Sequence, residues 1–400
     1  MKKNYDVAII GAGIVGLATA YKLIEQKPQL KILVLEKEKD VALHQTGHNS
    51  GVIHSGIYYK PNSLKAINCK TGYDQLLTFC KEYGIEYDLC GKVIVAVEQK
   101  ELQSLENIYK RGVENGLVGI KKINQEQIKE IEPYCSGISG IFVPQTGIIN
   151  YTDVSKKYRD IFLEHGGELQ LGHKVISIKQ QDGLNYIETN VSTFQSKWVI
   201  NCAGLYSDKI AKLTDASVDL QIIPFRGEYY DIKKEKQHLV KNLIYPVPNP
   251  DFPFLGVHFT RMVKGGVEAG PNAVFAFRRE GYTNTDINMK ELFEALTFRG
   301  FQKVAVKYWR DGLYEMYRSY SKRAFVSALQ RLVPDIQSED IVPGGAGVRA
   351  QACDSKGNLI DDFLIYEKNG VINVCNAPSP AATSSIAIGQ TISEKIITRL

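Results

Sequence analysis

Three glycines and one glutamate near the N-terminus have the types and spacing of a dinucleotide-binding motif. Gly11, Gly13 and Gly16 form the pattern G-x-G-x-x-G, and Glu36 follows about 20 residues later. The first glycine permits a tight turn, the second lets the backbone approach a pyrophosphate, and the third lets a helix pack on a strand. The start of that helix suits phosphate groups, and the Glu36 carboxylate suits ribose hydroxyls. An ordinary glycine turn in a βαβ unit is the alternative. The residues expected to contact the cofactor here are Gly11, Gly13, Ile14, Val15, Gly16, Glu36 and Lys37.

The next segment, residues 44–59, is polar and glycine-rich but lacks the composition of a mobile linker. It reads HQTGHNSGVIHSGIYY. Its glycines permit close backbone approach, and short polar side chains between them can donate hydrogen bonds. We expect it to line the far half of the cofactor, although a loop satisfied by its own hydrogen bonds has the same composition. The residues expected to contact the cofactor are Thr46, His48, Asn49, Ser50 and Gly51.

Further segments of small residues favour FAD over a nicotinamide cofactor. They are residues 201–204 (NCAG), residues 344–349 (GGAGVR) and a hydroxyl-rich helix start at residues 383–385. An extended, mostly buried FAD would occupy all of them, whereas a nicotinamide cofactor has a more compact footprint. The start of the last helix would stabilise negative charge on the flavin N1–C2 carbonyl region. The residues expected to contribute are Val175, Ala203, Gly204, Gly347, Arg349, Thr383, Ser384 and Ser385.

Alternating strands and helices are expected to position these residues. Apolar runs predict a strand from about Tyr5, a helix over 14–26, a parallel strand over 32–36 and a long helical stretch over 292–332. The expected fold class is α/β, with a discontinuous Rossmann-like FAD-binding domain of the glutathione-reductase type and an α+β substrate domain built on an antiparallel sheet. We expect the FAD-binding domain to comprise residues 1–85, 145–220 and 340–400, and the substrate-binding domain to comprise residues 86–144 and 221–339.

Composition narrows the class of protein. With 400 residues, 44% apolar and 23% charged, the chain is long enough for two ordinary globular domains. Its net charge of +5 comes from scattered lysines, without the basic and aromatic runs that would indicate nucleic-acid binding. Seven cysteines form no C-x-x-C pair, which favours reduced thiols and no metal site. No targeting segment or membrane span is expected, so we predict a cytoplasmic protein, with peripheral contact at the inner membrane left open.

Longer strings of residues resemble a known family. The glycine motif with Glu36, together with residues 48–51, 201–204 and 344–349, resembles the FAD-dependent oxidoreductases of the D-amino-acid-oxidase type. The resemblance to the L-2-hydroxyglutarate oxidase/dehydrogenase family within them runs from residue 5 to about 395, and its most specific strings are residues 44–59, 224–229, 253–258, 347–352 and 376–384. It implies FAD as cofactor and oxidation of L-2-hydroxyglutarate to 2-oxoglutarate. In that reaction a base takes the hydroxyl proton while the α-hydrogen leaves as hydride to flavin N5.

A histidine is the expected base for this reaction, because imidazole titrates near neutral pH and must lie within about 3 Å of the substrate hydroxyl. His54 is the first candidate because it lies in the segment expected to line the cofactor, and His258 is the second. Either could instead be a core histidine bonded to the backbone. His48 is expected to orient the flavin or the backbone.

The two substrate carboxylates require at least one arginine, whose planar fork matches a carboxylate. We expect Arg349 and Arg226 in this role, with Arg261 and Arg318 in reserve; each could instead be a solvated surface residue. Tyrosines could hydrogen-bond a carboxylate or merely pack, and the candidates are Tyr58, Tyr59 and Tyr229.

Other functions stay open at this stage. The same architecture could carry an amino- or imino-acid oxidase, or a flavoprotein without catalytic activity. Oxygen, a membrane quinone or an electron-transfer flavoprotein could accept the electrons. The oligomeric state and the mode of flavin attachment are also open.

Overall fold

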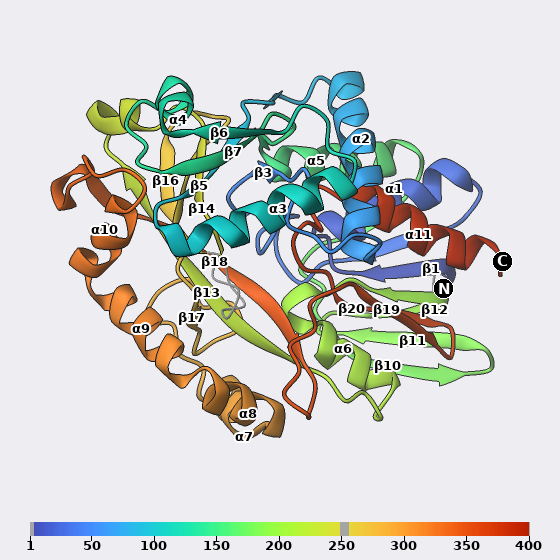
Figure 1. Ribbon diagram of the computed structural model, residues 1–400. Helices are drawn as coiled ribbons and strands as arrows, with labels where there is room; N and C mark the ends of the chain where they lie inside the picture. The colour runs from blue at the N-terminus through green and yellow to red at the C-terminus, as the bar shows by residue number, and fades with distance from the viewer. Residues whose placement is uncertain (1–3, 249–255, 400) are drawn as a thin grey trace.

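Two large β-sheets organise the molecule, and helices pack around them (Figure 1). The computed structural model describes residues 4–248 and 256–399, so Pro253–Leu255 of the family-like string lie outside the described residues. No helix among the described residues is long and apolar enough to cross a membrane. The seven cysteines are all free thiols.

The first sheet is a Rossmann-like parallel sheet with antiparallel additions. Its eight strands follow the order β10–β11–β12–β1–β2–β9, with β20 beside β12 and β19 beside β20. Parallel pairing joins β9, β2, β1, β12 and β20, which places the end of β1 in the middle of the sheet. The strands are β1 (Asn4–Ile10), β2 (Ile32–Leu35), β9 (Glu168–Gln170), β10 (Val175–Gln181), β11 (Leu184–Thr189), β12 (Thr193–Asn201), β19 (Leu364–Lys368) and β20 (Val371–Asn376).

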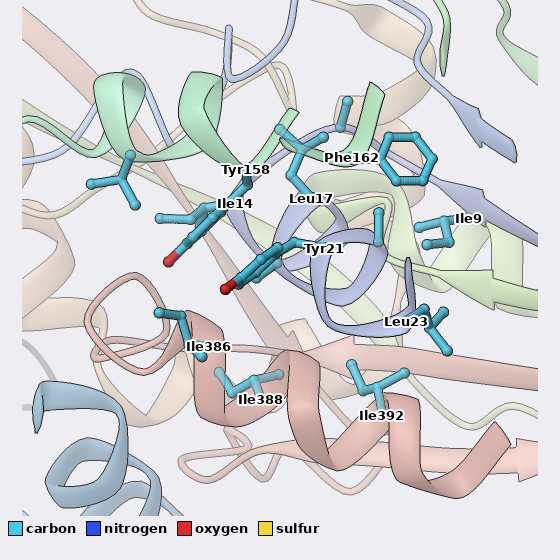
Figure 2. Close-up of a cluster of buried hydrophobic side chains, with 14 of the residues drawn as sticks. Ile9, Ile14, Leu17, Tyr21, Leu23, Tyr158, Phe162, Ile386, Ile388 and Ile392 are labelled. Atoms are coloured by element: carbon cyan, nitrogen blue, oxygen red, sulfur yellow. The ribbon is translucent and has the colours of Figure 1, made fainter. Parts of the chain in front are cut away.

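Three helices from distant parts of the sequence form the core beside this sheet. Figure 2 shows isoleucines of α11 facing α1, with Tyr158 and Phe162 of α5 on the other side of α1. The rings of Tyr21 and Tyr158 are nearly parallel, with centroids 5.6 Å apart. A Cβ at Gly389 would lie 2.7 Å from the backbone of Ala18, so this glycine lets α11 approach α1 closely. The helices around the first sheet are α1 (Ile14–Gln26), α2 (Leu64–Tyr83), α5 (Tyr151–Glu164), α6 (Ser207–Thr214) and α11 (Ser385–Ile397).

The second sheet is largely antiparallel. Its nine strands follow the order β17–β13–β16–β15–β14–β5–β7–β6, with β18 also paired to β13. The expected domain boundary at residue 340 would assign β18 to the FAD-binding domain, yet β18 pairs with β13 from Gln221↔Cys353 to Ile232↔Ile341. The strands are β5 (Lys92–Ala96), β6 (Lys121–Asn124), β7 (Ser139–Val143), β13 (Gln221–Ile232), β14 (Leu243–Pro246), β15 (His258–Arg261), β16 (Val267–Gly270), β17 (Val274–Phe275) and β18 (Ile341–Cys353).

The helical stretch expected over 292–332 is four short helices, which run along the outer edge of the second sheet (Figure 1). Extended backbone at Phe298 separates the first two, and Ser321 starts the fourth by accepting a hydrogen bond from the Ala324 N–H. These helices are α7 (Met289–Thr297), α8 (Arg299–Lys307), α9 (Trp309–Tyr320) and α10 (Lys322–Gln330). A small sheet of β3 (Val52–Ile53), β8 (Gly147–Ile149) and β4 (Tyr87–Asp88), with α3 (Leu102–Glu114) and α4 (Gln125–Ile131), completes the fold.

Candidate active site

The glycine motif forms a tight turn between β1 and α1. Gly11 has φ +104°, and a Cβ there would lie 2.5 Å from the carbonyl oxygen of Cys202. A Cβ at Gly16 would lie 2.0 Å from the carbonyl oxygen of Gly11. A larger residue at position 11 would therefore push β1 away from the end of β12, and one at position 16 would push α1 away from the turn.

Two side chains hold this turn in shape. Glu36 Oε2 accepts a hydrogen bond from the Ala12 N–H at 2.7 Å. Thr46 Oγ1 accepts one from the Ile14 N–H at 3.0 Å, which brings the polar segment back to the start of α1. Both contacts join residues that the sequence analysis assigned to one site.

A cavity of about 600 Å³ opens beside the turn. Its walls come from the ends of β1 and β2, the polar segment, β10 and the residues after β12. Residues expected to contact the cofactor that line it are Gly11, Gly13, Glu36, Lys37, Thr46, Val175, Ala203 and Gly204. Sequence reasoning did not select three other lining residues, His44, Tyr206 and Glu280.

A cluster of charges joins two walls of this cavity. Glu280 Oε1 lies 2.6 Å from Lys37 Nζ and 3.0 Å from His44 Nε2, and His44 also contacts Glu38 at 3.0 Å. Burial opposes the charge on His44, but its hydrogen bonds with Glu280 and Glu38 raise the pKa of the imidazole. Side-chain atoms of Glu38, His44 and Glu280 lie close enough together to hold a metal ion. However, the Lys37 ammonium contacts both glutamates, so the group is better described as a cluster of ion pairs.

The middle of the polar segment contacts the second sheet instead of the cavity. His48 Nδ1 donates to the Ala346 carbonyl at 2.8 Å, and a Cβ at Gly347 would lie 2.3 Å from the His48 carbonyl oxygen. Asn49 donates to the carbonyls of its own loop, and its Oδ1 accepts the Gly51 N–H at 2.9 Å. The Ser50 hydroxyl hydrogen-bonds Tyr229. These contacts fix the segment against β13 and β18.

The start of α11 lies beside the same segment. Thr383 Oγ1 accepts the backbone N–H of His54 at 3.1 Å and contacts the Tyr151 hydroxyl at 2.7 Å. Ser385 Oγ lies 3.2 Å from the Tyr158 hydroxyl. Ser384 Oγ is buried and has no hydrogen-bond partner among the described residues. One polar group at this helix start is thus left for a ligand.

The two candidate bases lie in one cluster, in which His258 is buried and His54 is partly buried. His54 Nε2 lies 3.2 Å from Ser379 Oγ, and His258 Nδ1 donates to the Gly256 carbonyl at 2.9 Å. Burial, with the positive charge of Lys92, lowers the pKa of His54 to about 3, and burial likewise lowers the pKa of His258 to about 3. Both imidazoles are therefore neutral at neutral pH, which is the form that accepts a proton.

Aromatic rings and a lysine surround these histidines. The Tyr245 ring lies 3.9 Å from the His258 ring, centroid to centroid. Lys92 Nζ lies 4.6 Å from the Tyr58 ring centroid and 4.7 Å from that of Tyr245. The sequence analysis gave Lys92 no role. A lysine at the start of the apolar run KVIVA was the available signal.

The candidate arginines differ in their surroundings. Arg349 lies near Tyr229 and Tyr245, and burial lowers the pKa of its guanidinium. Arg226 instead donates to Glu228 through Nε at 3.0 Å and Nη2 at 2.8 Å, and to the Thr283 carbonyl. Arg349 therefore lies beside the candidate base His258, whereas Arg226 belongs to an ion pair with Glu228. The reserves are also engaged, Arg261 with Asp88 and Arg318 with Glu315.

Comparison with known proteins assigns the chain to a family. Residues 6–395 match the sequence model of a family described as FAD dependent oxidoreductase. The chain belongs to this family. The resemblance seen in the sequence is thereby confirmed, and with it the FAD-binding α/β fold class and FAD as the cofactor of this FAD-dependent oxidoreductase.

Relatives of this oxidoreductase are similar over nearly its whole length. A protein from Indibacter alkaliphilus named L-2-hydroxyglutarate dehydrogenase is 56% identical over 397 residues, covering 99% of this chain and 100% of the relative. The human protein named mitochondrial L-2-hydroxyglutarate dehydrogenase is 46% identical over 410 residues, covering 98% of this chain and 89% of the relative.

Solved structures show the same fold at lower identity. The L-α-glycerophosphate oxidase of Mycoplasma pneumoniae, solved with FAD bound, has a TM-score of 0.80 and 23% identity, covering 100% of this chain and 96% of the other. The glycine oxidase of Geobacillus kaustophilus has a TM-score of 0.75 and 14% identity, with coverages of 99% and 95%. At these identities the likeness establishes the fold alone.

The residues of this oxidoreductase fit FAD at both ends of an extended cofactor. The cavity beside Gly11, Gly13 and Glu36 has the turn and the carboxylate that a pyrophosphate and a ribose require. The unpartnered Ser384 hydroxyl at the start of α11 suits the polar edge of a flavin ring. Gly11 to Gly16 with Glu36 would therefore hold the nucleotide, and Thr383 to Ser385 would face the flavin.

Proposed function

We propose that this oxidoreductase converts L-2-hydroxyglutarate to 2-oxoglutarate. The observation that carries the proposal is the placement of His54: its imidazole is neutral, and its backbone N–H donates to Thr383 at the start of α11, where the residues fit a flavin. Two relatives that span nearly the whole chain carry the name of this dehydrogenase activity, which supports the choice of substrate.

His54 acts as the base in the proposed reaction. Its neutral Nε2 would take the proton of the substrate hydroxyl as the C2–H bond breaks. A base with a pKa near 3 is weak, but a bound substrate carboxylate would offset the charge of Lys92 and so raise the pKa of His54. Bound FAD supplies the acceptor for the electron pair of the C2–H bond.

Arg349 and Tyr229 orient the substrate in the same proposal. The Arg349 guanidinium would bind the carboxylate next to C2 through two parallel hydrogen bonds, which fix the C2–H direction. Tyr229, held by Ser50, keeps its hydroxyl protonated because burial raises its pKa to about 12, so it can donate to the same carboxylate. The surrounding rings of Tyr58 and Tyr245 exclude water from the reacting carbon.

Anaerobic mixing of the holoenzyme with candidate substrates tests this function. L-2-hydroxyglutarate is expected to bleach the flavin absorbance, and D-2-hydroxyglutarate is expected to leave it unchanged. Bleaching by glycine, proline or another amino acid instead would favour an amino- or imino-acid oxidase. A yellow protein that no 2-hydroxy acid or amino acid bleaches would be a flavoprotein without this catalytic activity.

We also propose that the electron acceptor is a membrane quinone, reached by peripheral contact at the cytoplasmic side of an inner membrane. Support comes from the outer helices α7–α9, which expose large apolar side chains that include Val306 at 76% and Trp309 at 55%. Lysines and arginines such as Lys303, Lys307 and Arg310 are exposed on the same helices. Aromatic, apolar and basic side chains together suit a surface of anionic lipids.

Vesicle sedimentation tests the membrane contact. The holoenzyme should sediment with vesicles of phosphatidylcholine and phosphatidylglycerol and less with phosphatidylcholine alone. Trp309→Ser should weaken this binding, whereas Val118→Ser, at an even more exposed apolar position outside these helices, should not. Dimerisation through α7–α9 without vesicle binding would contradict the proposal, as would faster reoxidation by oxygen than by a quinone analogue.

The proposed function uses both domains. The strand pairing supports a FAD-binding domain around the parallel sheet and a substrate domain around the second sheet, which we propose should include β18.

A further inference from the structure

Lys92 is a buried lysine whose ammonium group pairs with no acidic side chain among residues 4–248 and 256–399. It begins β5, where its Cα is paired with that of Val143, and its side chain is 1% exposed. Its ammonium group lies over the rings of Tyr58 and Tyr245 and makes no hydrogen bond or ion pair with the residues that the structure describes. A buried ammonium without an anion is unfavourable in a folded protein.

The charge of Lys92 acts on both candidate bases. It lowers the pKa of His54 and, with Arg349, that of His258. Burial itself lowers the pKa of Lys92 to about 7, and the charged or titratable neighbour that counters this is Cys69. No acidic side chain of residues 4–248 and 256–399 contributes to the pKa of Lys92, so none of them offers this ammonium a carboxylate.

Two further observations point to a ligand at this position. The Tyr58 hydroxyl is buried and has no hydrogen-bond partner among the described residues, although its ring contacts Lys92. Tyr245 lies on β14 and His258 on the neighbouring strand β15. Lys92 approaches this pair from β5, on one side of β14, whereas Arg349 approaches it from β18, which pairs with β13 on the other side of β15. Two cations thus act on one pair of rings, which suits a ligand with two anionic groups.

We propose that Lys92, with the Tyr58 hydroxyl, binds the second carboxylate of a 2-hydroxy dicarboxylic acid and so selects dicarboxylates over monocarboxylates. The inference rests on the proposed function, in which Arg349 holds the carboxylate next to C2. The planar guanidinium suits the carboxylate whose direction controls C2–H, while a lysine, as a point charge, suits the end of a flexible chain.

The test compares two substrates that differ only at the far end. L-2-hydroxyglutarate and L-2-hydroxypentanoate share a five-carbon chain, and only the first carries a second carboxylate. In the holoenzyme, Lys92→Met should lower kcat/KM for L-2-hydroxyglutarate about 100-fold, because a charge-assisted hydrogen bond is lost, and leave kcat/KM for L-2-hydroxypentanoate unchanged or higher. Lys92→Arg should recover part of the loss.

Binding and stability provide readouts that a structural role would not produce. Glutarate, followed by its effect on flavin absorbance, should bind Lys92→Met about 100-fold more weakly, whereas butyrate should bind equally well. Replacing an unpaired buried charge by an apolar side chain should maintain or raise the unfolding temperature. Lys122→Met is the matched control, because Lys122 lies on β6 of the same sheet, 4.7 Å from the ring centroid of Tyr109, but is exposed.

The outcomes separate the inference from the proposed function. If the wild-type enzyme does not oxidise L-2-hydroxyglutarate, the proposed function fails. If it does, but Lys92→Met retains its preference for L-2-hydroxyglutarate over L-2-hydroxypentanoate, the inference alone is wrong. Equal losses with both substrates would also overturn it, because they would place Lys92 at the carboxylate next to C2 or in a structural role.

Discussion

The imidazole of His54 is in hydrogen-bonding contact with Ser379, whose hydroxyl oxygen lies 3.2 Å from Nε2. Ser379 also hydrogen-bonds the Tyr59 hydroxyl, and the backbone N–H of His54 donates to Thr383. The position of the ring is therefore set by residues that are far away in the sequence but lie around the start of α11. Tyr59, a candidate for a hydrogen bond to a substrate carboxylate, thus also contacts Ser379.

Replacing His54 by glutamine should separate catalysis from cofactor binding. Glutamine can still hydrogen-bond Ser379, but it cannot take up a proton, so we expect flavin reduction by L-2-hydroxyglutarate to slow by about 10²- to 10⁴-fold. The FAD content after purification should be unchanged, because His54 is not among the residues that line the cavity. Stopped-flow absorbance under anaerobic conditions measures the rate.

His258→Gln is the comparison variant for this experiment. His258 donates through Nδ1 to the Gly256 carbonyl and packs on Tyr245, so its replacement should reduce the rate less than the His54 variant does. A larger loss in His258→Gln would exchange the roles of the two histidines. An unchanged rate in His54→Gln would remove His54 from the proton transfer.

The two candidate arginines should respond to substitution in opposite ways. Arg349→Lys keeps a positive charge but loses the two parallel hydrogen bonds, so KM for L-2-hydroxyglutarate should rise at least 10-fold with the unfolding temperature little changed. Arg226→Met removes the charged partner of Glu228, which is partly exposed and keeps hydrogen bonds from Asn272 and Ser319, so it should cost about 1–3 kcal/mol of folding stability and change KM little. Steady-state kinetics and urea unfolding measure the two effects, and the reverse pattern would assign Arg226 to the substrate.

The N-terminal half of the cofactor site was predictable because its determinants are local. The glycine spacing and Glu36 specify one turn between adjacent elements, and Gly11 and Glu36 contact neighbours at the ends of β1, β2 and β12. The hydroxyl-rich start of α11 was predictable for the same reason, since a helix N-terminus is recognisable from its own residues.

The substrate side was less predictable because its determinants are distant in the sequence. Nothing local shows that the glycine-rich residues 344–349 form the middle of a long strand instead of a loop. Lys92 looked like the first residue of an ordinary strand, and only the fold places it over Tyr58 and Tyr245. Glu280 gave no signal, because its partners lie more than 200 residues away.

Acid should destabilise the folded protein through His54 and His258. The pKa values of His54 and His258 fall from an ordinary 6.5 to about 3 on folding, so between these values the unfolded chain binds more protons than the native protein. Stability is thus full above pH 6.5 and falls below it, by up to about 1.4 kcal/mol per pH unit for each histidine.

The comparison of histidine variants isolates this effect from the titration of carboxylates. In urea unfolding with saturating FAD, His258→Gln should have a shallower loss of stability between pH 6.5 and pH 4.5 than the wild type. His165→Gln, which replaces an exposed histidine, should follow the wild type. Parallel pH profiles for all three proteins would show that His258 takes up its proton in the native state.

Retention of FAD should depend on the ion-pair cluster at the cavity. Glu280 contacts Lys37 and His44, and all three line the cavity, so the cluster joins segments that must separate when the cofactor leaves. Glu280→Gln should therefore raise the rate of FAD release about 5- to 10-fold at pH 6.5, measured from the recovery of flavin fluorescence after dilution. Glu294→Gln is the control, because Glu294 lines the same cavity but pairs with Lys209.

The same cluster predicts how release depends on pH. Hydrogen bonds with Glu280 and Glu38 outweigh burial and raise the pKa of His44 above 6.5. Protonated His44 therefore stabilises the ion-pair cluster fully below pH 6.5, and this stabilisation is lost as the pH rises through the raised pKa of His44. FAD release from the wild type should accelerate over that range, while release from His44→Gln should vary less with pH because glutamine does not titrate. Equal pH dependence in both proteins would show that His44 does not control release.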